Sequence, residues 1–308
     1  MIQQLLFRIA NEKPFFHPVV RGFPGVPART AFLPSLVALA ARAREEARPL
    51  RILEVGSWVG SSALAWVEGL RDACAGEGTV YCVDLWHTDS SAFVFEPGAM
   101  ALANEWHQIG YEVFRYNVQV AGAQPWVVPM LGDSRKVLPA LAPASFDIVY
   151  VDGYHGYEIA TEDIAHAKRL VRDGGIVCGD DLELQVHECD AAALARDRHL
   201  DDGVEPTSGR PYHPGVTAAV DEHFGRVRPH IGLWAMRRLG AEHPRWEPVV
   251  LETLPVSIPR YFPTGTATEA LRTLYENGWE RADDGTHRHR SARAHGSKTR
   301  CASASPPC

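Results

Sequence analysis

Residues 146–182 constrain the fold of this chain more than any other stretch of its sequence. They contain two short apolar runs, at residues 148–151 and 176–178, and a stretch with helical periodicity between them. A strand, a crossover helix and a second strand form the unit from which parallel sheets are built. This segment therefore predicts two parallel strands that are neighbours in a sheet.

The expected crossover helix has one apolar face. The members of that face recur at helical spacing and are Ala160, Ile164, Ala167 and Val171. Gly174 and Gly175 follow shortly after them, and glycine is a common stop signal for a helix. We therefore expect these two glycines to end the helix.

Acidic residues follow both apolar runs. Asp152 comes directly after the first run, and Asp180 and Asp181 follow Gly179 after the second. The carboxyl ends of adjacent parallel strands lie at one rim of the sheet, where open α/β sheets bind their ligands. Three carboxylates crowded there would raise each other's pKa, and a hard divalent cation would remove the conflict. The sequence therefore predicts a site for Mg²⁺, Mn²⁺ or Ca²⁺, although any one of these acids alone is explained equally well as a helix cap.

Upstream, the sequence predicts a strand at residues 51–55, a glycine turn, a helix and a strand at residues 79–83. The turn lacks the G-x-G-x-x-G of a dinucleotide site, and no Gly-Lys-Ser/Thr of a phosphate-binding loop precedes the helix. The remaining common interpretation of E-x-G-x-x-x-G is a site for S-adenosylmethionine. The turn residues that we expect to contact this donor are Glu54, Gly56, Ser57, Gly60 and Ser61. Ser61 or its neighbour Ser62 is also expected to cap the helix.

Further polar residues end the other strands at the same rim. Asp84 ends the second strand, where a carboxylate can accept both ribose hydroxyls, although a single acid at a strand end is more often simply solvated. Asp133 and Ser134 follow an expected third strand at residues 126–131 and can bond an adenine edge, although alone they form only a turn. Asp152 is expected to serve the donor as well as the cation.

His155 lies three residues after Asp152, just beyond a strand end. Histidine is the side chain most readily poised as a base near neutral pH, so we favour a role as general base over that of a surface residue. It is also a candidate metal ligand, but a carboxylate-rich site favours a hard ion that prefers oxygen.

Charge and composition exclude several other classes. The net charge of −7 gives no electrostatic support to a general nucleic-acid role. No apolar run approaches the ~20 residues that a membrane span needs, and the N-terminal stretch does not resemble a secretory signal. None of the cysteines forms a C-x-x-C pair, which argues against zinc and favours a reducing cytoplasm. We therefore expect a cytoplasmic protein whose partner is a small molecule, and the sequence leaves a homo-oligomer open.

The chain is expected to have four parts. They are an N-terminal arm and helix at residues 1–50, a candidate lid; a central domain at 51–240; an extension at 241–284; and a disordered tail at 285–308. Within the central domain we expect a helix at residues 100–116, a mobile loop at 203–215 and a closing pair of strands at 226–230 and 231–237.

Taken together, these motifs resemble class I S-adenosylmethionine-dependent methyltransferases in their order along the chain. Four short motifs indicate a smaller group within this family: DLW at residues 84–86, GDS at 132–134, VDGYHGYE at 151–158 and GDD at 179–181. These look like the metal-dependent small-molecule O-methyltransferases, and most like those that act on macrolide sugars. The chain departs from the more distant catechol O-methyltransferases, which have Asn at the position of Asp181 and a Lys base.

The resemblance implies a Rossmann-like, mostly parallel seven-stranded sheet with helices on both faces and an antiparallel last strand. It implies that Asp152, Asp180 and Asp181 hold Mg²⁺ and that His155 is the base. The expected function is transfer of a methyl group to a hydroxyl of a diol-bearing small molecule. Two alternatives stay open: a binding protein that holds S-adenosylmethionine without catalysis, and a metal-dependent hydroxylase or hydrolase.

Overall fold

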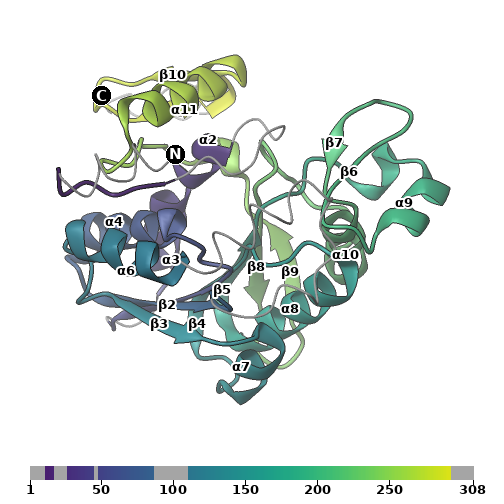
Figure 1. The fold of residues 1–308 in the computed structure, drawn as a ribbon, viewed down its shortest axis with the longest axis horizontal. Helices are drawn as coiled ribbons and strands as arrows, with labels where there is room; N and C mark the ends of the chain where they lie inside the picture. The colour runs from purple at the N-terminus through teal and green to yellow at the C-terminus, as the bar shows by residue number, and fades with distance from the viewer. Residues whose placement is uncertain (1–10, 17–25, 45–47, 87–109, 293–308) are drawn as a thin grey trace, which may run out of the picture.

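The centre of the computed structural model, which describes residues 11–16, 26–44, 48–86 and 110–292, is a seven-stranded sheet (Figure 1). Its strand order is β3-β2-β1-β4-β5-β8-β9. The strands are β1 Leu50–Val55, β2 Gly78–Asp84, β3 Val127–Leu131, β4 Phe146–Val151, β5 Val171–Gly179, β8 Trp234–Leu239 and β9 Arg245–Pro248. The first five run parallel to one another, which confirms the expected Rossmann-like α/β fold.

The far edge of the sheet differs from the expectation. Strand β8 pairs antiparallel with β5, and β9 pairs antiparallel with β8. Within this sheet β8 is therefore the one strand that runs opposite to the others. Strand β9, the last of the sheet along the chain, runs in the same direction as β5. The expected closing pair was also placed too early, because residues 226–230 and 231–233 precede β8 and lie outside both strands.

Helices cover both faces of the sheet (Figure 1). One face carries α3 (Leu33–Ala43), α4 (Ser61–Cys74) and α6 (Gly110–Val120). The other carries α7 (Ser134–Ala140), α8 (Tyr157–Leu170) and α10 (Pro214–Phe224). The described part of the expected helix at residues 100–116 belongs to α6, and its residues 100–109 lie outside the described ranges.

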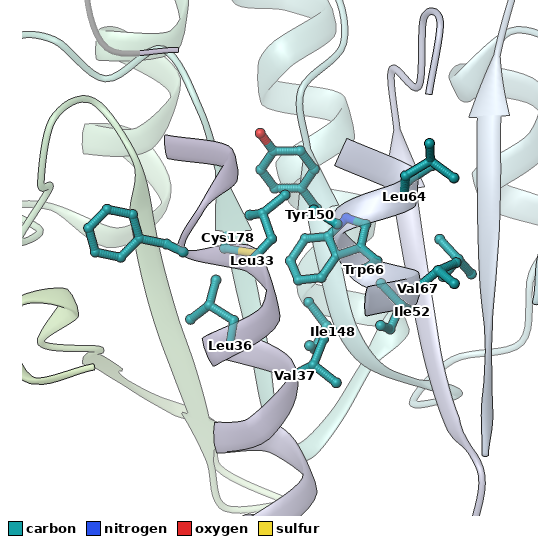
Figure 2. Close-up of a cluster of buried hydrophobic side chains, with 14 of the residues drawn as sticks. Leu33, Leu36, Val37, Ile52, Leu64, Trp66, Val67, Ile148, Tyr150 and Cys178 are labelled. Atoms are coloured by element: carbon teal, nitrogen blue, oxygen red, sulfur yellow. The ribbon is translucent and has the colours of Figure 1, made fainter. Parts of the chain in front are cut away.

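The core beneath α3 and α4 forms because apolar residues recur on one face of each helix. Leu33, Leu36 and Val37 point from α3 toward the sheet, where Ile148 and Tyr150 of β4 meet them (Figure 2). Trp66 of α4 is fully buried, and its ring centroid lies 5.6 Å from that of Tyr150. Each such buried side chain contributes about 1.5–3 kcal/mol, so this core fixes the helices that flank the rim.

The end of α8 corrects the interpretation of the paired glycines. Ala160, Ile164 and Ala167 are buried as expected, but the helix ends at Leu170 and β5 begins at the next residue. Gly174 and Gly175 lie inside β5, where the pairing register with β4 shifts. Gly174 has a φ of +74°, a conformation that glycine adopts without strain. The glycines therefore form an irregularity in the strand instead of a helix stop.

The C-terminal extension shares the core of the central domain. Its α11 (Thr264–Glu276) packs on α2 (Val26–Thr30), and the ring of Trp279 lies 5.1 Å from that of Phe32 (Figure 1). Strand β9 lies wholly beyond the expected boundary at residue 240 and still belongs to the sheet.

Two short hairpins replace expected loops. Strands β6 (Gly203–Val204) and β7 (Pro211–Tyr212) pair within the segment expected to be a mobile loop. Strands β10 (Trp279–Arg281) and β11 (His287–His289) pair inside the expected C-terminal extension and tail, so disorder does not hold for residues 285–292. The remaining elements are η2 (Val186–Glu188), α9 (Ala191–Asp197) and η3 (Leu251–Thr253). In the described ranges no helix combines the length and the apolar character that crossing a membrane requires.

Candidate functional site

The structure brings the three predicted acids together at the carboxyl rim. Strands β4 and β5 are neighbours, with Val151 opposite Gly179, so the residues that follow them emerge side by side. Asp152, Asp180 and Asp181 each offer a carboxylate oxygen, and these oxygens lie within 4.8 Å of one another. Asp180 and Asp181 are only 7% and 9% exposed, so water screens their charges poorly.

The electrostatics of these acids show an excess of negative charge. Burial raises the pKa of Asp152 well above its usual range, and the charges of Asp180 and Asp181 raise it further. Burial also raises the pKa of Asp180, although Arg29 opposes that rise. None of the described residues donates a hydrogen bond to the Asp152 carboxylate. Burial would also raise the pKa of Asp181, but the charges of His213 and His155 outweigh it and lower that pKa. An all-oxygen cluster with these opposed shifts is suited to a hard divalent cation.

Arg29 lies beside these acids, although no sequence motif singled it out. It is 1% exposed and belongs to α2. Its Nη1 donates to Oδ1 of Asp180 at 2.7 Å and to Oδ1 of Asp181 at 3.0 Å. Its Nη2 donates to Oε1 of Glu183 at 2.7 Å. One guanidinium thus serves three carboxylates, which leaves the cluster negative.

His155 is held between two carboxylates. Its Nδ1 lies 2.9 Å from Oδ1 of Asp201, and its Nε2 lies 3.0 Å from Oδ2 of Asp181. Burial alone would lower the pKa of His155, but the charges of Asp201 and Asp181 outweigh it and raise that pKa well above the usual range. Gly215, at the start of α10, approaches so closely that a Cβ there would lie 2.2 Å from the His155 carbonyl oxygen. The position of His155 is therefore fixed by its neighbours as well as by β4.

His213 lies at the edge of the same cluster. Its ring centroid is 4.4 Å from that of His155, and its Nδ1 lies 3.0 Å from Oε2 of Glu183. His155, Asp181 and His213 form a second group with ligand atoms close enough to share an ion. The two groups share Asp181, and the first offers only oxygen, which Mg²⁺ and Mn²⁺ favour over imidazole.

The glycine turn after β1 lies against the acidic cluster. Gly56 has a φ of +85°, and a Cβ there would lie 1.9 Å from the carbonyl oxygen of Asp152. The Asp152 amide in turn donates to the Val55 carbonyl. Only glycine permits this approach, so the backbone places the expected donor turn in contact with the expected cation site.

Asp84 ties the turn to the end of β2. Its Oδ2 accepts a hydrogen bond from the amide of Trp58 at 2.8 Å, and its Oδ1 accepts one from the amide of Trp86 at 2.9 Å. Trp58 and Trp86 both have positive φ, at 46° and 42°. Two non-glycine residues held in this conformation mark a strained and closely determined turn, which is typical of a ligand site.

Several turn residues have roles in the fold, and one expectation about the helix cap is corrected. Glu54 is fully buried, and its carboxylate accepts hydrogen bonds from Ser62 Oγ and Cys82 Sγ, so it supports the turn from beneath. Gly60, with a φ of 86°, is the N-cap of α4, and no side chain caps this helix. The expectation that Ser61 or Ser62 caps it is therefore wrong. Ser57 is 2% exposed and lies within the turn.

Asp133 and Ser134 occupy the expected place at the end of β3, next to β2. The Asp133 side chain caps α7 through the amide of Arg135 and also pairs with the Arg135 guanidinium at 2.7 Å. This hydrogen bonding lowers the pKa of Asp133. Ser134 hydrogen-bonds the buried Asp163, whose pKa burial raises to about 7. Both residues thus have roles in the fold as well as a position at the rim.

Residues 53–182 match the family model described as a methyltransferase domain. This range begins in β1 and ends just after Asp181, so it contains both the glycine turn and the acidic cluster. A catechol O-methyltransferase from Mycobacterium tuberculosis is 32% identical over 119 residues, which are 37% of this chain and 50% of that protein. An O-methyltransferase named ankF from Aspergillus thermomutatus is 28% identical over 134 residues, which are 44% of this chain and 46% of that protein.

The chain spans about half the length of these two relatives. Among solved structures, the O-methyltransferase NovP is 18% identical, with a TM-score of 0.44, and the match covers 63% of this chain and 70% of that one. A likeness at that level carries no argument about activity. The matched domain nevertheless confirms that this chain resembles class I S-adenosylmethionine-dependent methyltransferases.

Proposed function

We propose that this protein is an S-adenosylmethionine-dependent, divalent-metal-dependent O-methyltransferase that acts on a diol-bearing small molecule. The observation that carries the proposal is the contact between two sites. Gly56 of the donor turn lies against the Asp152 backbone, and the Asp152 side chain belongs to the acidic cluster. A methyl donor and a cation-bound acceptor would therefore lie next to each other, as an in-line displacement requires.

Asp152, Asp180 and Asp181 would hold the cation. They fit because they are oxygen donors only, lie at the ends of adjacent strands and carry charge that the described residues do not balance. When bound, a hard divalent cation supplies Lewis acidity toward an acceptor hydroxyl and coordination positions that suit two adjacent oxygens. This preference for adjacent oxygens supports a diol such as a sugar of a natural product or a catechol. The name of the mycobacterial relative, a catechol O-methyltransferase, supports the same substrate class.

The glycine turn and Asp84 would hold the donor. When bound, S-adenosylmethionine supplies an electrophilic methyl group on a positively charged sulfur. Gly56 leaves room for the methionine end of the donor because it has no side chain. The Asp84 oxygens accept two backbone amides of the turn region, and a carboxylate at this strand end could also accept the ribose hydroxyls.

His155 would accept the proton from the acceptor hydroxyl. Asp201 lies at Nδ1 and favours a proton on that nitrogen, while Asp181 at Nε2 also raises the pKa of His155. Nε2 would become the basic atom when the cation takes up the charge of Asp181. Nε2 faces Asp181, one of the three clustered acids, so the base lies at the edge of the cation site. Asp201 therefore acts as a positioning residue that the sequence did not reveal.

Calorimetric titration with S-adenosylmethionine and with its demethylated product tests the proposal. We expect both to bind, and we expect methyl transfer to diol acceptors with Mg²⁺ but not with a chelator. Donor binding without transfer to any diol under Mg²⁺ would favour the non-catalytic binding protein. Metal binding without donor binding would favour the hydroxylase or hydrolase.

A further inference from the structure

Arg29 is a fully enclosed cationic side chain at the rim, 1% exposed, and several groups around it accept its hydrogen bonds. Four hydrogen bonds leave the guanidinium: those to Asp180, Asp181 and Glu183, and a fourth from Nε to the Ile231 carbonyl. The planar fork of arginine matches several carboxylates at fixed angles, which the single ammonium of lysine does not.

The backbone opposite Arg29 is shaped to receive it. Gly232 has a φ of +91°, and a Cβ there would lie 2.5 Å from Nη2 of Arg29. Ala28 on α2 and Ala31 just after it are fully buried, and α11 packs on the same helix. Because the side chain is held from both sides, Arg29 is a fixed part of the rim.

Arg29 approaches the acids from the side away from the cavity of the site. A small cavity at the rim is lined by Asp152, His155, Asp180 and Asp181, and Arg29 is not among its lining residues. Arg29 donates to the Oδ1 atoms of both Asp180 and Asp181. Arg29 therefore leaves Oδ2 of both carboxylates uncontacted, and Oδ2 of Asp181 lies 3.0 Å from Nε2 of His155, which lines the cavity.

We infer that Arg29 is a positioning residue of the cation site: its guanidinium fixes one oxygen of Asp180 and one of Asp181, so that their other oxygens converge with Asp152. This inference rests on the proposed metal dependence. The inference also gives a role to the N-terminal segment, because Arg29, which lies 151 positions before Asp180 in the chain, contacts the acidic cluster. Mutation of a residue that orients metal ligands in this way typically lowers metal affinity about 10- to 100-fold.

If Arg29 acted only through its charge, its removal would change the cation affinity in the opposite direction. A positive charge near the acids repels a divalent cation, so removal of Arg29 would strengthen cation binding if charge alone mattered. If Arg29 orients the ligands, its removal weakens binding despite the loss of repulsion. The direction of the change therefore separates the two roles.

The test is Mn²⁺ binding to the full-length protein, measured as free Mn²⁺ by electron paramagnetic resonance. The variants are Arg29→Lys, which keeps the charge and loses the fork, and Arg29→Gln, which loses both. Arg48→Gln is the matched control, because Arg48 forms a two-bond pair with the buried Asp147 at the opposite end of the sheet. Thermal unfolding of each variant reports separately on stability.

We expect both Arg29 variants to bind Mn²⁺ about 10- to 100-fold more weakly than wild type, and Arg48→Gln to bind it normally. Unchanged or tighter binding by Arg29→Gln overturns the inference, as does normal binding by Arg29→Lys. If Arg29→Gln does not fold, the Lys variant decides the question. If the wild-type protein binds no Mn²⁺, the proposed metal dependence fails first, and the role of Arg29 falls with it.

Discussion

Buried acids at the two ends of the sheet differ in how many partners balance their charge. At the amino end, Asp147 receives two hydrogen bonds from Arg48, one from the Arg51 amide, and the approach of Arg172 Nε at 3.5 Å. At the carboxyl end, Asp180, Asp181 and Glu183 share the guanidinium of Arg29, with His155 beside Asp181 and His213 beside Glu183. The nearby Asp152 receives no hydrogen bond from the described residues.

This difference in charge balance separates structural acids from functional ones. A buried carboxylate with more than one arginine is already compensated, so it stabilises the fold and needs no ligand. Several buried carboxylates that share one arginine keep a negative charge that the fold does not offset, and such sites are where ligands and ions bind. Four predictions test this contrast, from the largest expected effect to the smallest.

Asp180→Asn should remove metal-dependent turnover, with a loss of about 1,000-fold, because one ligand of the cation is lost. Donor affinity should stay nearly intact. Asp147→Asn should instead cost about 2 kcal/mol of stability through its unpaired arginines and leave the rate of the folded enzyme unchanged. Initial rates, donor titration and thermal unfolding measure these effects. An equal loss of donor binding in Asp180→Asn would show that Asp180 is structural.

His155→Asn should lower kcat about 100-fold or more, the usual effect of losing a general base. Asp201→Asn should cause a smaller loss and shift the pH profile of kcat, since it disturbs the tautomer of a histidine that remains in place. Rates measured across pH with saturating Mg²⁺ separate the two variants. A normal kcat for His155→Asn would exclude it as the base.

Gly56→Ala and Gly174→Ala compare two positive-φ glycines at opposite ends of the sheet. At both positions, the left-handed backbone conformation costs alanine about 1–2 kcal/mol of folding free energy. Only at Gly56 would the new Cβ meet backbone, whereas at Gly174 nothing lies within 4 Å. Gly174→Ala should therefore lower only the melting temperature, and Gly56→Ala should also weaken donor binding at least about tenfold. Equal donor affinity in both variants would argue against a donor site at the turn.

Glu54→Gln should stabilise the protein more as the pH rises. Burial raises the Glu54 pKa from 4.5 to about 8, so between these values the unfolded state is ionised while the folded state holds the proton. Glu54 therefore costs stability progressively from pH 4.5 to 8, by at most about 5 kcal/mol. Unfolding by denaturant at pH 5 and pH 8 measures the gain from Gln. A gain that is the same at both values would contradict the raised pKa.

The sequence predicted the parallel strands and the rim acids because both depend on local pattern. Apolar runs mark buried strands, and adjacent parallel strands must end at one rim, so the convergence of Asp152 with Asp180 and Asp181 followed from chain order. The glycine turn was recognisable for the same reason. That turn also indicated the candidate donor, the place of His155 just beyond a strand end indicated the base, and the family resemblance agreed with both.

The residues that complete the site were not predictable in this way. Arg29 reaches the acids from α2, and His213 reaches them from the segment before α10. Asp201, from that same segment, contacts His155, and no spacing rule relates these residues to the rim. The ends of elements were also missed where tertiary packing prevailed over local signals. Gly174 and Gly175 read as a helix stop, yet they form an irregularity within β5.

The central claim is that the rim acids hold a divalent cation beside the donor turn. Crystals grown with Mn²⁺ and demethylated S-adenosylmethionine allow a direct test by anomalous scattering at the manganese edge. The account predicts one strong peak among the carboxylates of Asp152, Asp180 and Asp181, with the nucleoside at Asp84. A peak between His155 and His213, or none at the rim under saturating Mn²⁺, would contradict it.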